Sequence, residues 1–347
     1  MCHKISLKGF HWYKCDRLDK ALIYHSGILA FEQLTKLYVR IHMRLNRRQF
    51  LILSSIGVTS LAFLAKLLGN QSAQSTYVQP SKDIQPSLTP TPAPNPLLLR
   101  FISVADTGTG TQGQYAVAQA MTQYHSQNPF NLAILAGDNI YTNGEFEKIG
   151  AVFERPYQKL LQQGVKFHAC LGNHDIRTDN GDKQVSYPGF NMQGRYYTFR
   201  RDSVQFFALD TNFNADWKNQ LVWLEQQLSR SDAPWKIVFG HHQIYSSGAY
   251  GVNQPFIETL VPLFKKSGVQ LYINGHDHNY ERTRSINGTT YLICGGGAGI
   301  RPVGRSEWTE HSASKLSFAA FEVYADRIVV SGIGTDNRVF DRGIIHV

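Results

Sequence analysis

Asp138 and Tyr141 bring a carboxylate and a phenol into one short segment, residues 137–141. The segment directly follows the apolar run 132–136, which predicts a buried strand. Two side chains at the end of one strand can face the same point. Aspartate is a hard oxygen ligand that can bridge two cations, and tyrosine suits a hard, highly charged ion such as ferric iron. On its own the segment fits a solvated turn better, so the interpretation depends on the rest of the chain.

Four further clusters of this kind end apolar runs elsewhere. Together the five are Asp106-x-Gly108, Gly137-Asp138-x-x-Tyr141, Gly172-Asn173-His174-Asp175, Val238-x-x-His241 and Gly275-His276-x-His278. In open α/β sheets, functional groups gather at the carboxyl ends of the strands. Glycine at such a position lets the chain turn tightly and approach a bound ion. Five such clusters in this order predict a two-metal site.

In these clusters the chain resembles the calcineurin-like metallophosphoesterases and, within them, the purple acid phosphatases of the small tartrate-resistant type. The resemblance covers about residues 97–347. Many relatives have Asp-x-His in the first cluster, and that histidine binds a metal. Here Gly108 stands in its place, and the phenol of Tyr141 fills the vacancy. This exchange marks the purple subgroup, because charge transfer from tyrosinate to ferric iron produces the colour.

The resemblance implies two sets of ligands that share one carboxylate. The ferric site would take Asp106, Asp138, Tyr141 and His278, and the divalent site would take Asp138, Asn173, His241 and His276. Two cations held ~3.5–4 Å apart can clamp the attacking and leaving oxygens of an in-line displacement. Oxygen and imidazole ligands suit Fe(III) in one site and Fe, Zn or Mn in the other.

The implied function is that of an exported, metal-dependent phosphoric monoester hydrolase, an acid phosphatase. Hydroxide held at the Fe(III)–M(II) centre would attack a small phosphorylated substrate. A phosphodiesterase or nucleotide hydrolase with the same centre is the alternative. A protein that only binds metal or phosphate is a third reading, against which the complete ligand set and His174 argue.

Four further residues are candidates for the reaction itself. The family pattern implies that His174 contacts the phosphate and protonates the leaving alkoxide, and Asp175 is a candidate to orient its imidazole. His242 either lines the pocket or caps the strand end. Where small acid phosphatases have a histidine near the leaving group, this chain has Tyr250, a poorer proton donor, so the pH optimum stays open.

The segment 210–217 is short, whereas mammalian relatives carry a long inhibitory loop there. We therefore expect no activation by proteolysis. The glycine-rich segment 294–299 lacks the lysine and the helix of a phosphate-binding loop. We interpret it as a turn that packs near the metals.

The elements that must position these residues alternate along the chain. Strands are expected at 97–105, 132–136, 165–171, 196–200, 204–209, 235–240 and 269–274, and several more in 283–347. Helices are expected at 113–127, 145–163, 217–228 and 256–267, with a polar loop at 176–194. This order predicts a layered α/β fold, and the resemblance implies a four-layer αββα sandwich.

The basic charge belongs to the first part of the chain. Residues 1–75 hold 11 of the 35 Lys and Arg but only 3 of the 26 Asp and Glu, so the rest is nearly neutral. There is therefore no electrostatic case for a nucleic-acid partner. Arg47 and Arg48 precede the apolar run 51–65, which is typical of a twin-arginine signal and shorter than a spanning helix.

The sequence divides into four parts. Residues 1–42 are either an upstream misreading before a true start at Met43 or a real extension, and residues 43–75 are the signal. Residues 76–96 contain six of the thirteen prolines and predict an extended linker. Residues 97–347 form one metallophosphoesterase domain. The expected location is periplasmic or secreted, with the twin-arginine machinery as partner and membrane contact only through an uncleaved signal.

Two cysteines, Cys170 and Cys294, fall in the predicted domain, each at the end of an apolar run. They are either buried free thiols or a disulfide between neighbouring strands, and the sequence leaves both readings open.

Overall fold

The computed structural model describes residues 2–7, 10–15 and 95–347. The predicted signal and nearly all of the predicted linker lie outside these ranges. Residues 2–7 and 10–15 form two antiparallel strands, β1 (Cys2–Leu7) and β2 (Phe10–Cys15). In the part of the chain that is described, no helix is both long and apolar enough to cross a bilayer.

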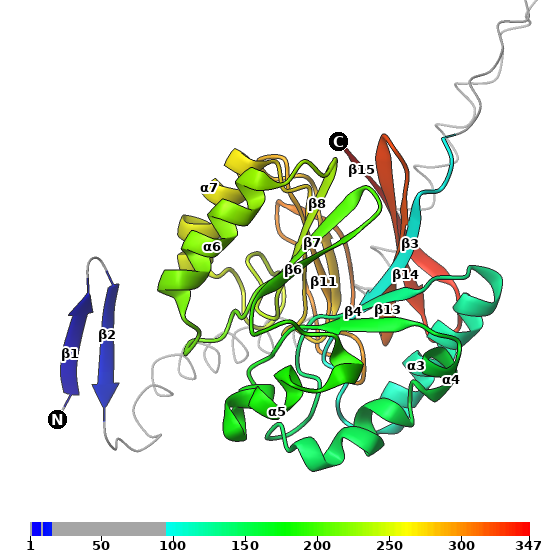
Figure 1. Ribbon diagram of the computed structural model, residues 1–347, viewed down its shortest axis with the longest axis horizontal. Helices are drawn as coiled ribbons and strands as arrows, with labels where there is room; N and C mark the ends of the chain where they lie inside the picture. The colour runs from blue at the N-terminus through cyan, green and yellow to red at the C-terminus, as the bar shows by residue number, and fades with distance from the viewer. Residues whose placement is uncertain (1, 8–9, 16–94) are drawn as a thin grey trace, which may run out of the picture. The chain divides into compact units, whose positions relative to one another are not determined.

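Two β-sheets form the centre of the unit that contains residues 95–347 (Figure 1). In spatial order, the six-stranded sheet contains β15 (Val339–His346), β14 (Arg327–Gly334), β13 (Ser317–Val323), β3 (Leu99–Val104), β4 (Leu132–Leu135) and β5 (Lys166–Ala169). The seven-stranded sheet contains β12 (Thr309–Ala313), β10 (Tyr280–Thr283), β11 (Thr290–Cys294), β9 (Leu271–Asn274), β8 (Trp235–Phe239), β7 (Val204–Ala208) and β6 (Tyr197–Arg201).

Each sheet has a parallel part that matters for the site. β3, β4 and β5 are neighbours and run parallel in the six-stranded sheet. β7, β8, β9 and β11 do the same in the seven-stranded sheet. The loops that follow β3, β4, β5, β8 and β9 are the ones that carry the five clusters. Parallel pairing brings the carboxyl ends of neighbouring strands to one edge of their sheet.

Helices cover the outer face of each sheet (Figure 1). α3 (Gln112–Gln127) and α4 (Gln158–Gln162) pack on the six-stranded sheet, where Val117 and Met121 join a buried cluster with Ile102. α6 (Trp217–Arg230) and α7 (Gln254–Ser267) pack on the seven-stranded sheet, where Leu224 joins Val238. Each sheet therefore buries one set of side chains under its helices, which gives two outer cores.

A third core lies between the two sheets. Phe101 of β3 stacks on Phe321 of β13 with ring centroids 4.4 Å apart and meets the edge of Phe206 from the other sheet at 5.2 Å. Cys170 and Cys294 are buried in this core as free thiols, so the disulfide reading is wrong. The layer order is helix, sheet, sheet, helix, which confirms the predicted αββα sandwich.

Two local predictions need correction. The helix expected at 145–163 is broken into η1 (Phe146–Lys148), η2 (Gly150–Glu154) and α4, because Pro156 cannot donate a helical hydrogen bond. The loop expected at 176–194 contains short helical turns instead. These are η3 (Asp175–Arg177), η4 (Asp179–Gly181), α5 (Asp182–Val185) and η5 (Pro188–Phe190).

Candidate metal centre

The predicted ligands lie at the carboxyl ends of five strands, three from one sheet and two from the other. The turns that carry them are tight, and Asp106, Asp138 and His276 have φ of 58°, 52° and 70°. Two glycines are required by close approach. A Cβ on Gly172 would lie 2.2 Å from Asp138 Oδ1, and one on Gly275 would lie 2.3 Å from Asp106 Oδ2. Side chains at these positions would displace the carboxylates themselves.

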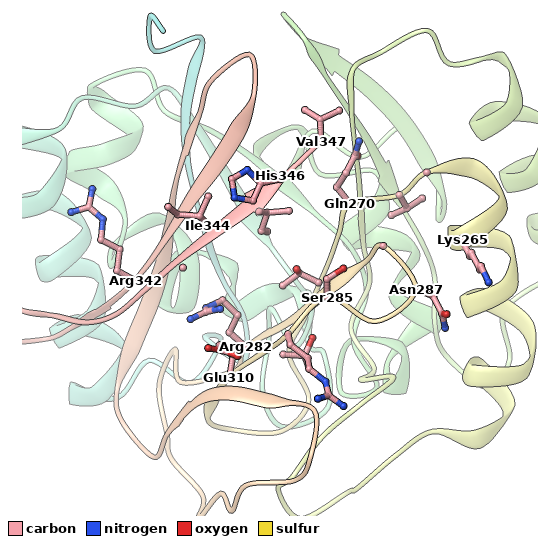
Figure 2. Close-up of a pocket in the computed structure, with 18 residues that line it drawn as sticks. Lys265, Gln270, Arg282, Ser285, Asn287, Glu310, Arg342, Ile344, His346 and Val347 are labelled. Carbon is pink, nitrogen blue, oxygen red and sulfur yellow. The ribbon is translucent and has the colours of Figure 1, made fainter. Parts of the chain in front are cut away.

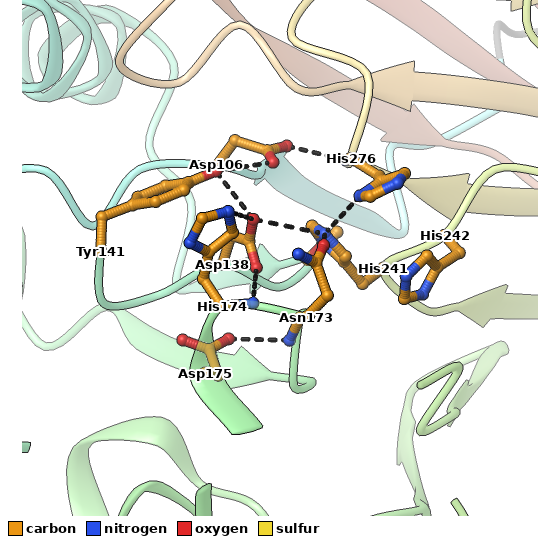
Figure 3. A network of polar contacts seen from close by, with 12 residues as sticks. Asp106, Asp138, Tyr141, Asn173, His174, Asp175, His241, His242 and His276 are labelled. Atoms are coloured by element: carbon orange, nitrogen blue, oxygen red, sulfur yellow. Dashed lines mark hydrogen bonds and ion pairs between the residues drawn. The ribbon is translucent and has the colours of Figure 1, made fainter. Parts of the chain in front are cut away.

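The first group of predicted ligands meets at the phenol of Tyr141 (Figure 3). The hydroxyl lies 3.0 Å from Asp106 Oδ1, 2.8 Å from Asp138 Oδ2 and 3.1 Å from His278 Nε2. Its single proton can serve only one of these three acceptor contacts at a time. These four side chains are the set that the resemblance implied for the ferric site.

The second group meets at the imidazole of His241 (Figure 3). Its Nε2 lies 3.1 Å from Asn173 Oδ1, 3.2 Å from His276 Nδ1 and 3.5 Å from Asp138 Oδ2. His241 Nδ1 lies 3.0 Å from the carbonyl oxygen of Ala136 and must donate its proton there, since a carbonyl only accepts. The Nε2 lone pair of the neutral ring is therefore directed at other acceptors.

Asp138 joins the two groups. One oxygen, Oδ2, faces both Tyr141 and His241, whereas the other, Oδ1, accepts the backbone N–H of His174 at 2.9 Å. The side chain is almost completely buried. A fixed carboxylate with one oxygen between two groups of donors has the geometry expected of a bridging ligand.

The electrostatics of the site favour neutral imidazoles. Burial, reinforced by the neighbouring histidines, lowers the pKa of His276 to about 2 and that of His241 well below its usual value. Burial, together with the carboxylates of Asp106 and Asp138, raises the pKa of the Tyr141 phenol far above its usual value. Neutral imidazoles offer lone pairs, and a buried phenol between two carboxylates ionises only if positive charge is supplied.

Cations fit this donor set. Asp106, Asp138 and His241 offer three buried ligand atoms within 4.8 Å of one another. Around them, lone pairs face lone pairs at hydrogen-bond distance with too few protons to satisfy them. Carboxylate, phenol, amide oxygen and imidazole are the ligands that iron, zinc and manganese accept. The seven predicted ligands are thus all brought together, in the two groups that were expected.

His174 lies beside these groups, at their solvent-facing side. Its Nδ1 donates to the carbonyl oxygen of Thr142 at 2.6 Å, and its Nε2 lies 4.0 Å from Asp138 Oδ2. The guanidinium of Arg177 approaches the same Nε2 at 3.3 Å. The ring is therefore held by a backbone carbonyl on one side and keeps Nε2 directed toward the site.

Asp175 does not orient the His174 ring, so that hypothesis is wrong. Its carboxylate is completely buried and accepts the backbone N–H groups of Gly172, Asn139 and Ile140 at 2.7–3.1 Å. The side chain of Asn139 donates to it as well. Asp175 therefore ties the loop after β4 to the loop after β5. Its role is to position the two loops and not to contact a reacting group.

His242 and Tyr250 lie next to the second group. His242 Nδ1 pairs with the hydroxyl of Thr211 at 2.9 Å, and its ring centroid lies 4.5 Å from that of His276. The ring of Tyr250 stacks on His276 with centroids 4.0 Å apart and an interplanar angle of 21°. Tyr250 is about half exposed, so it forms an outer wall of the site.

Sequence reasoning missed three residues that hold the site in place. Thr211 accepts the backbone N–H groups of both His241 and His242. Asp277, completely buried, accepts the hydroxyl of Ser246 at 2.6 Å and fixes the loop that carries Tyr250. Arg301 donates hydrogen bonds to the backbone carbonyl oxygens of His276 and His278. Only Asp277 gave a sequence signal, since it lies inside the Gly275-His276-x-His278 cluster.

A groove of about 710 Å³ on another part of the surface contains none of the predicted site residues (Figure 2). It lies beside the last residues of β15 and the turn after β10, and Arg282 and Arg284 belong to its lining. β9 connects the two regions, because Gln270 borders the groove before the strand while the ligands His276 and His278 follow it.

Comparison with known proteins shows which family the domain resembles. The family model described as calcineurin-like phosphoesterase matches residues 99–280. Purple acid phosphatase 7 of Arabidopsis thaliana is 30% identical over 233 residues, which is 58% of this chain and 70% of that protein. Tartrate-resistant acid phosphatase type 5 of Mus musculus is 27% identical over 255 residues, 62% of this chain and 77% of that protein.

Solved structures show the same fold. GAP50, described as the anchor in the inner membrane complex of Plasmodium, has a TM-score of 0.66 at 24% identity and covers 73% of this chain and 90% of its own. The purple acid phosphatase PPD1 from yellow lupin (Lupinus luteus) seeds has a TM-score of 0.62 at 19% identity. It covers 72% of this chain and 53% of its own.

Proposed function

This chain belongs to the calcineurin-like phosphoesterase family, among the purple acid phosphatases, and we propose that it hydrolyses phosphate monoesters at a dinuclear metal centre. The observation that supports this most directly is the meeting of seven donor side chains in two groups that share one oxygen, Asp138 Oδ2. A single metal would not need a second group of ligands.

Asp106, Tyr141 and His278 would hold Fe(III), and Asn173, His241 and His276 would hold Fe, Zn or Mn in the divalent state. Asp138 would bridge the pair. When bound, such a pair neutralises phosphate charge and lowers the pKa of water. The protein contributes the rigid arrangement, since the backbone N–H groups of His174 and His276 fix the outward oxygens of Asp138 and Asp106.

His174 would bind the phosphate and deliver the proton to the leaving alkoxide from Nε2. Its Nδ1 donates to the carbonyl of Thr142, so Nε2, which faces the site beside Arg177, would carry the transferred proton when the ring is doubly protonated. Tyr250 and His242 would border the leaving group, Tyr250 with its hydroxyl as a hydrogen-bond donor. Neither ring contacts Asp138, which keeps both away from the bridging position.

The preference between esters is the direct test of this function. We expect the protein loaded with iron and zinc to hydrolyse para-nitrophenyl phosphate faster than bis(para-nitrophenyl) phosphate. A faster reaction with the diester would favour the phosphodiesterase alternative. If neither ester turns over while two metals are bound, the protein only binds metal or phosphate.

His174→Asn tests the proton donor. General acid catalysis contributes about 10²–10⁴ in rate, so kcat should fall within that range while the metal content per chain stays unchanged. Arg155→Gln, at an exposed arginine that bonds the carbonyl of Gly150 away from the site, is the control. Activity of His174→Asn within about threefold of the wild type would contradict the assignment.

The chain would reach a periplasmic or extracellular location through the twin-arginine machinery, guided by Arg47 and Arg48. Its partners would be a small phosphorylated substrate and that machinery, and not nucleic acid. Membrane contact would occur only through an uncleaved signal. Export in the folded state suits a protein that binds its metals before it crosses a membrane.

A further inference from the structure

Arg301 is a charged residue that lies against the site and has no part in the proposed chemistry. We propose that Arg301 is a specificity-determining residue, which binds a second anionic group of the substrate next to the phosphate that is transferred. The preferred substrates would be phosphate monoesters whose leaving group carries a carboxylate or a further phosphate. This inference rests on the proposed phosphatase function and deepens it.

Arg301 is held on the backbone of the Gly275-His276-x-His278 cluster. It lies in the loop between β11 and β12, and its backbone N–H donates to the carbonyl oxygen of His278 at 2.7 Å. Its guanidinium Nη1 donates to the carbonyl oxygen of His276 at 3.4 Å. The loop is therefore attached to two predicted ligands by main-chain contacts, and the charged end of the side chain stays beside them.

Tyr250 gives the guanidinium a defined place. The guanidinium carbon of Arg301 lies 5.2 Å from the centroid of the Tyr250 ring, and the same ring stacks on His276. An arginine over an aromatic face is favourable and keeps its N–H groups available at the rim. His276, Tyr250 and Arg301 thus form a continuous wall that runs from the predicted ligands outward.

The charge of Arg301 is not balanced by a protein carboxylate. Among residues 95–347 its guanidinium donates one hydrogen bond, to the carbonyl oxygen of His276, and the bond to His278 is made by its backbone N–H. Arg195 and Arg282, by contrast, pair with Asp210 and Asp341 at 2.8 and 2.7 Å. A guanidinium has five N–H donors in a planar fork that matches a carboxylate or a phosphate. Most of these donors remain free for a ligand.

The position favours a second anionic group over the transferred phosphate itself. Within residues 95–347, Arg301 makes no hydrogen bond to a donor atom of the seven predicted ligands, and its guanidinium contacts the ring of Tyr250 at the outer wall. Asn173 and His174 lie at the other side of His241, next to Asp138. A phosphate bound at the ligand atoms would keep its ester oxygen within reach of His174, and the far end of its leaving group would extend to the Tyr250 and Arg301 wall.

Two esters that differ in one group test this by kinetics. 2-Phosphoglycolate carries a carboxylate beside its phosphate, whereas ethyl phosphate of similar size does not. For the metal-loaded full chain, Arg301→Gln should lower the ratio of kcat/KM for phosphoglycolate to kcat/KM for ethyl phosphate about tenfold, mainly through KM. Arg284→Gln, an exposed arginine of the other groove, should leave this ratio unchanged. An unchanged ratio in Arg301→Gln would overturn the inference, and so would an equal fall in Arg284→Gln.

A binding measurement separates this inference from the proposed activity. Calorimetry on the metal-loaded protein should show tighter binding of methylenediphosphonate than of methylphosphonate. Arg301→Gln should lower the ratio of the two affinities about tenfold. Equal affinities for the two probes in the wild type would overturn the inference even if the enzyme is active. If neither ester is hydrolysed but the preference depends on Arg301, the proposed activity fails and the anion site stands. An unchanged thermal unfolding curve is required of both variants.

Discussion

At the scale of single residues, the centre depends on which atom of each side chain faces inward. Asp138 presents Oδ2 to both groups, while Tyr141 presents a phenol oxygen where many relatives have a histidine. Burial and two carboxylates keep this phenol protonated in the absence of a cation, because they raise its pKa. A bound ferric ion would reverse that balance, and the resulting tyrosinate would give the protein its colour.

Tyr141→Phe should abolish the visible charge-transfer absorption of the iron-loaded protein. The substitution removes the phenol oxygen but leaves Asp106, Asp138 and His278 in place, so some iron should remain bound. Tyr250→Phe is the matched control, since its hydroxyl is not part of either group, and this variant should keep the colour. A colour that survives in Tyr141→Phe would show that another residue provides the charge transfer.

The identity of the site residues could be predicted better than their hydrogen-bond partners. All seven predicted ligands could be named without the structure, because their clusters end apolar runs and the family resemblance implied which side chains face the metals. The partner of His174 was wrong, since the backbone carbonyl of Thr142 holds the ring and a main-chain acceptor leaves no mark in the sequence. Arg301 was missed for a related reason, because its contacts are to the carbonyls of His276 and His278.

At the scale of elements, the regular strands were predicted well, whereas the irregular segments 145–163 and 176–194 were not. β4 (Leu132–Leu135) and β8 (Trp235–Phe239) are short apolar runs with clear ends, and the structure places both within one residue of the expectation. In 145–163 and 176–194, two prolines, Pro156 and Pro188, and several glycines divide the chain into short helical turns, whose stability depends on tertiary contacts. Asp175 provides such contacts to three backbone N–H groups.

Arg282 of β10 and Asp341 of β15 link the two sheets by a bidentate ion pair. Arg282 donates to both oxygens of Asp341 at 2.7 and 2.8 Å, and the hydroxyl of Tyr280 adds a third bond at 2.7 Å. Burial would raise the pKa of the Asp341 carboxyl, but these hydrogen bonds outweigh burial and hold it below its usual value. His311 Nδ1 also lies 3.7 Å from this carboxylate.

Asp341→Asn should therefore destabilise the fold in a pH-dependent way. Because the pKa of Asp341 is lower in the folded state, its contribution is complete above the unfolded value of about 3.9 and is lost as the pH falls through the folded value. Breaking a buried pair costs about 3–5 kcal/mol. Urea unfolding at pH 7 should show that difference, and it should shrink below about pH 4. Asp326→Asn, at an exposed pair with Arg327, is the control. A difference that does not change with pH would contradict the ion-pair account.

At the scale of the whole molecule, the site exists only where the two sheets meet. The six-stranded sheet provides Asp106, Asp138, Tyr141 and Asn173, and the seven-stranded sheet provides His241, His276 and His278. Neither sheet holds all the residues predicted for either of the two proposed metal sites. The core between the sheets, with Phe101 against Phe206, therefore fixes the distance between the two halves of the centre.

The predicted signal at residues 43–75, which lies outside the described part of the chain, is also tested at this scale. Replacing Arg47 and Arg48 by lysines should keep the protein in the cytoplasm of a bacterial host that has the twin-arginine pathway. Cell fractionation followed by immunoblotting measures this. Arg44→Lys, outside the arginine pair, is the control and should leave export intact. Export of the Arg47/Arg48 variant at the wild-type level would contradict the signal assignment.

The number of metal ions per chain tests the central claim most directly. After reconstitution with iron and zinc and removal of loose metal, elemental analysis should find two ions per chain in the wild type. Asp138→Asn, which changes the shared ligand, should retain fewer than one, and Asp179→Asn on the surface should retain two. Two ions in the wild type with loss in Asp138→Asn is the result we predict. A wild type that binds one ion or none, or an Asp138→Asn variant that keeps two, would contradict a centre built around this carboxylate.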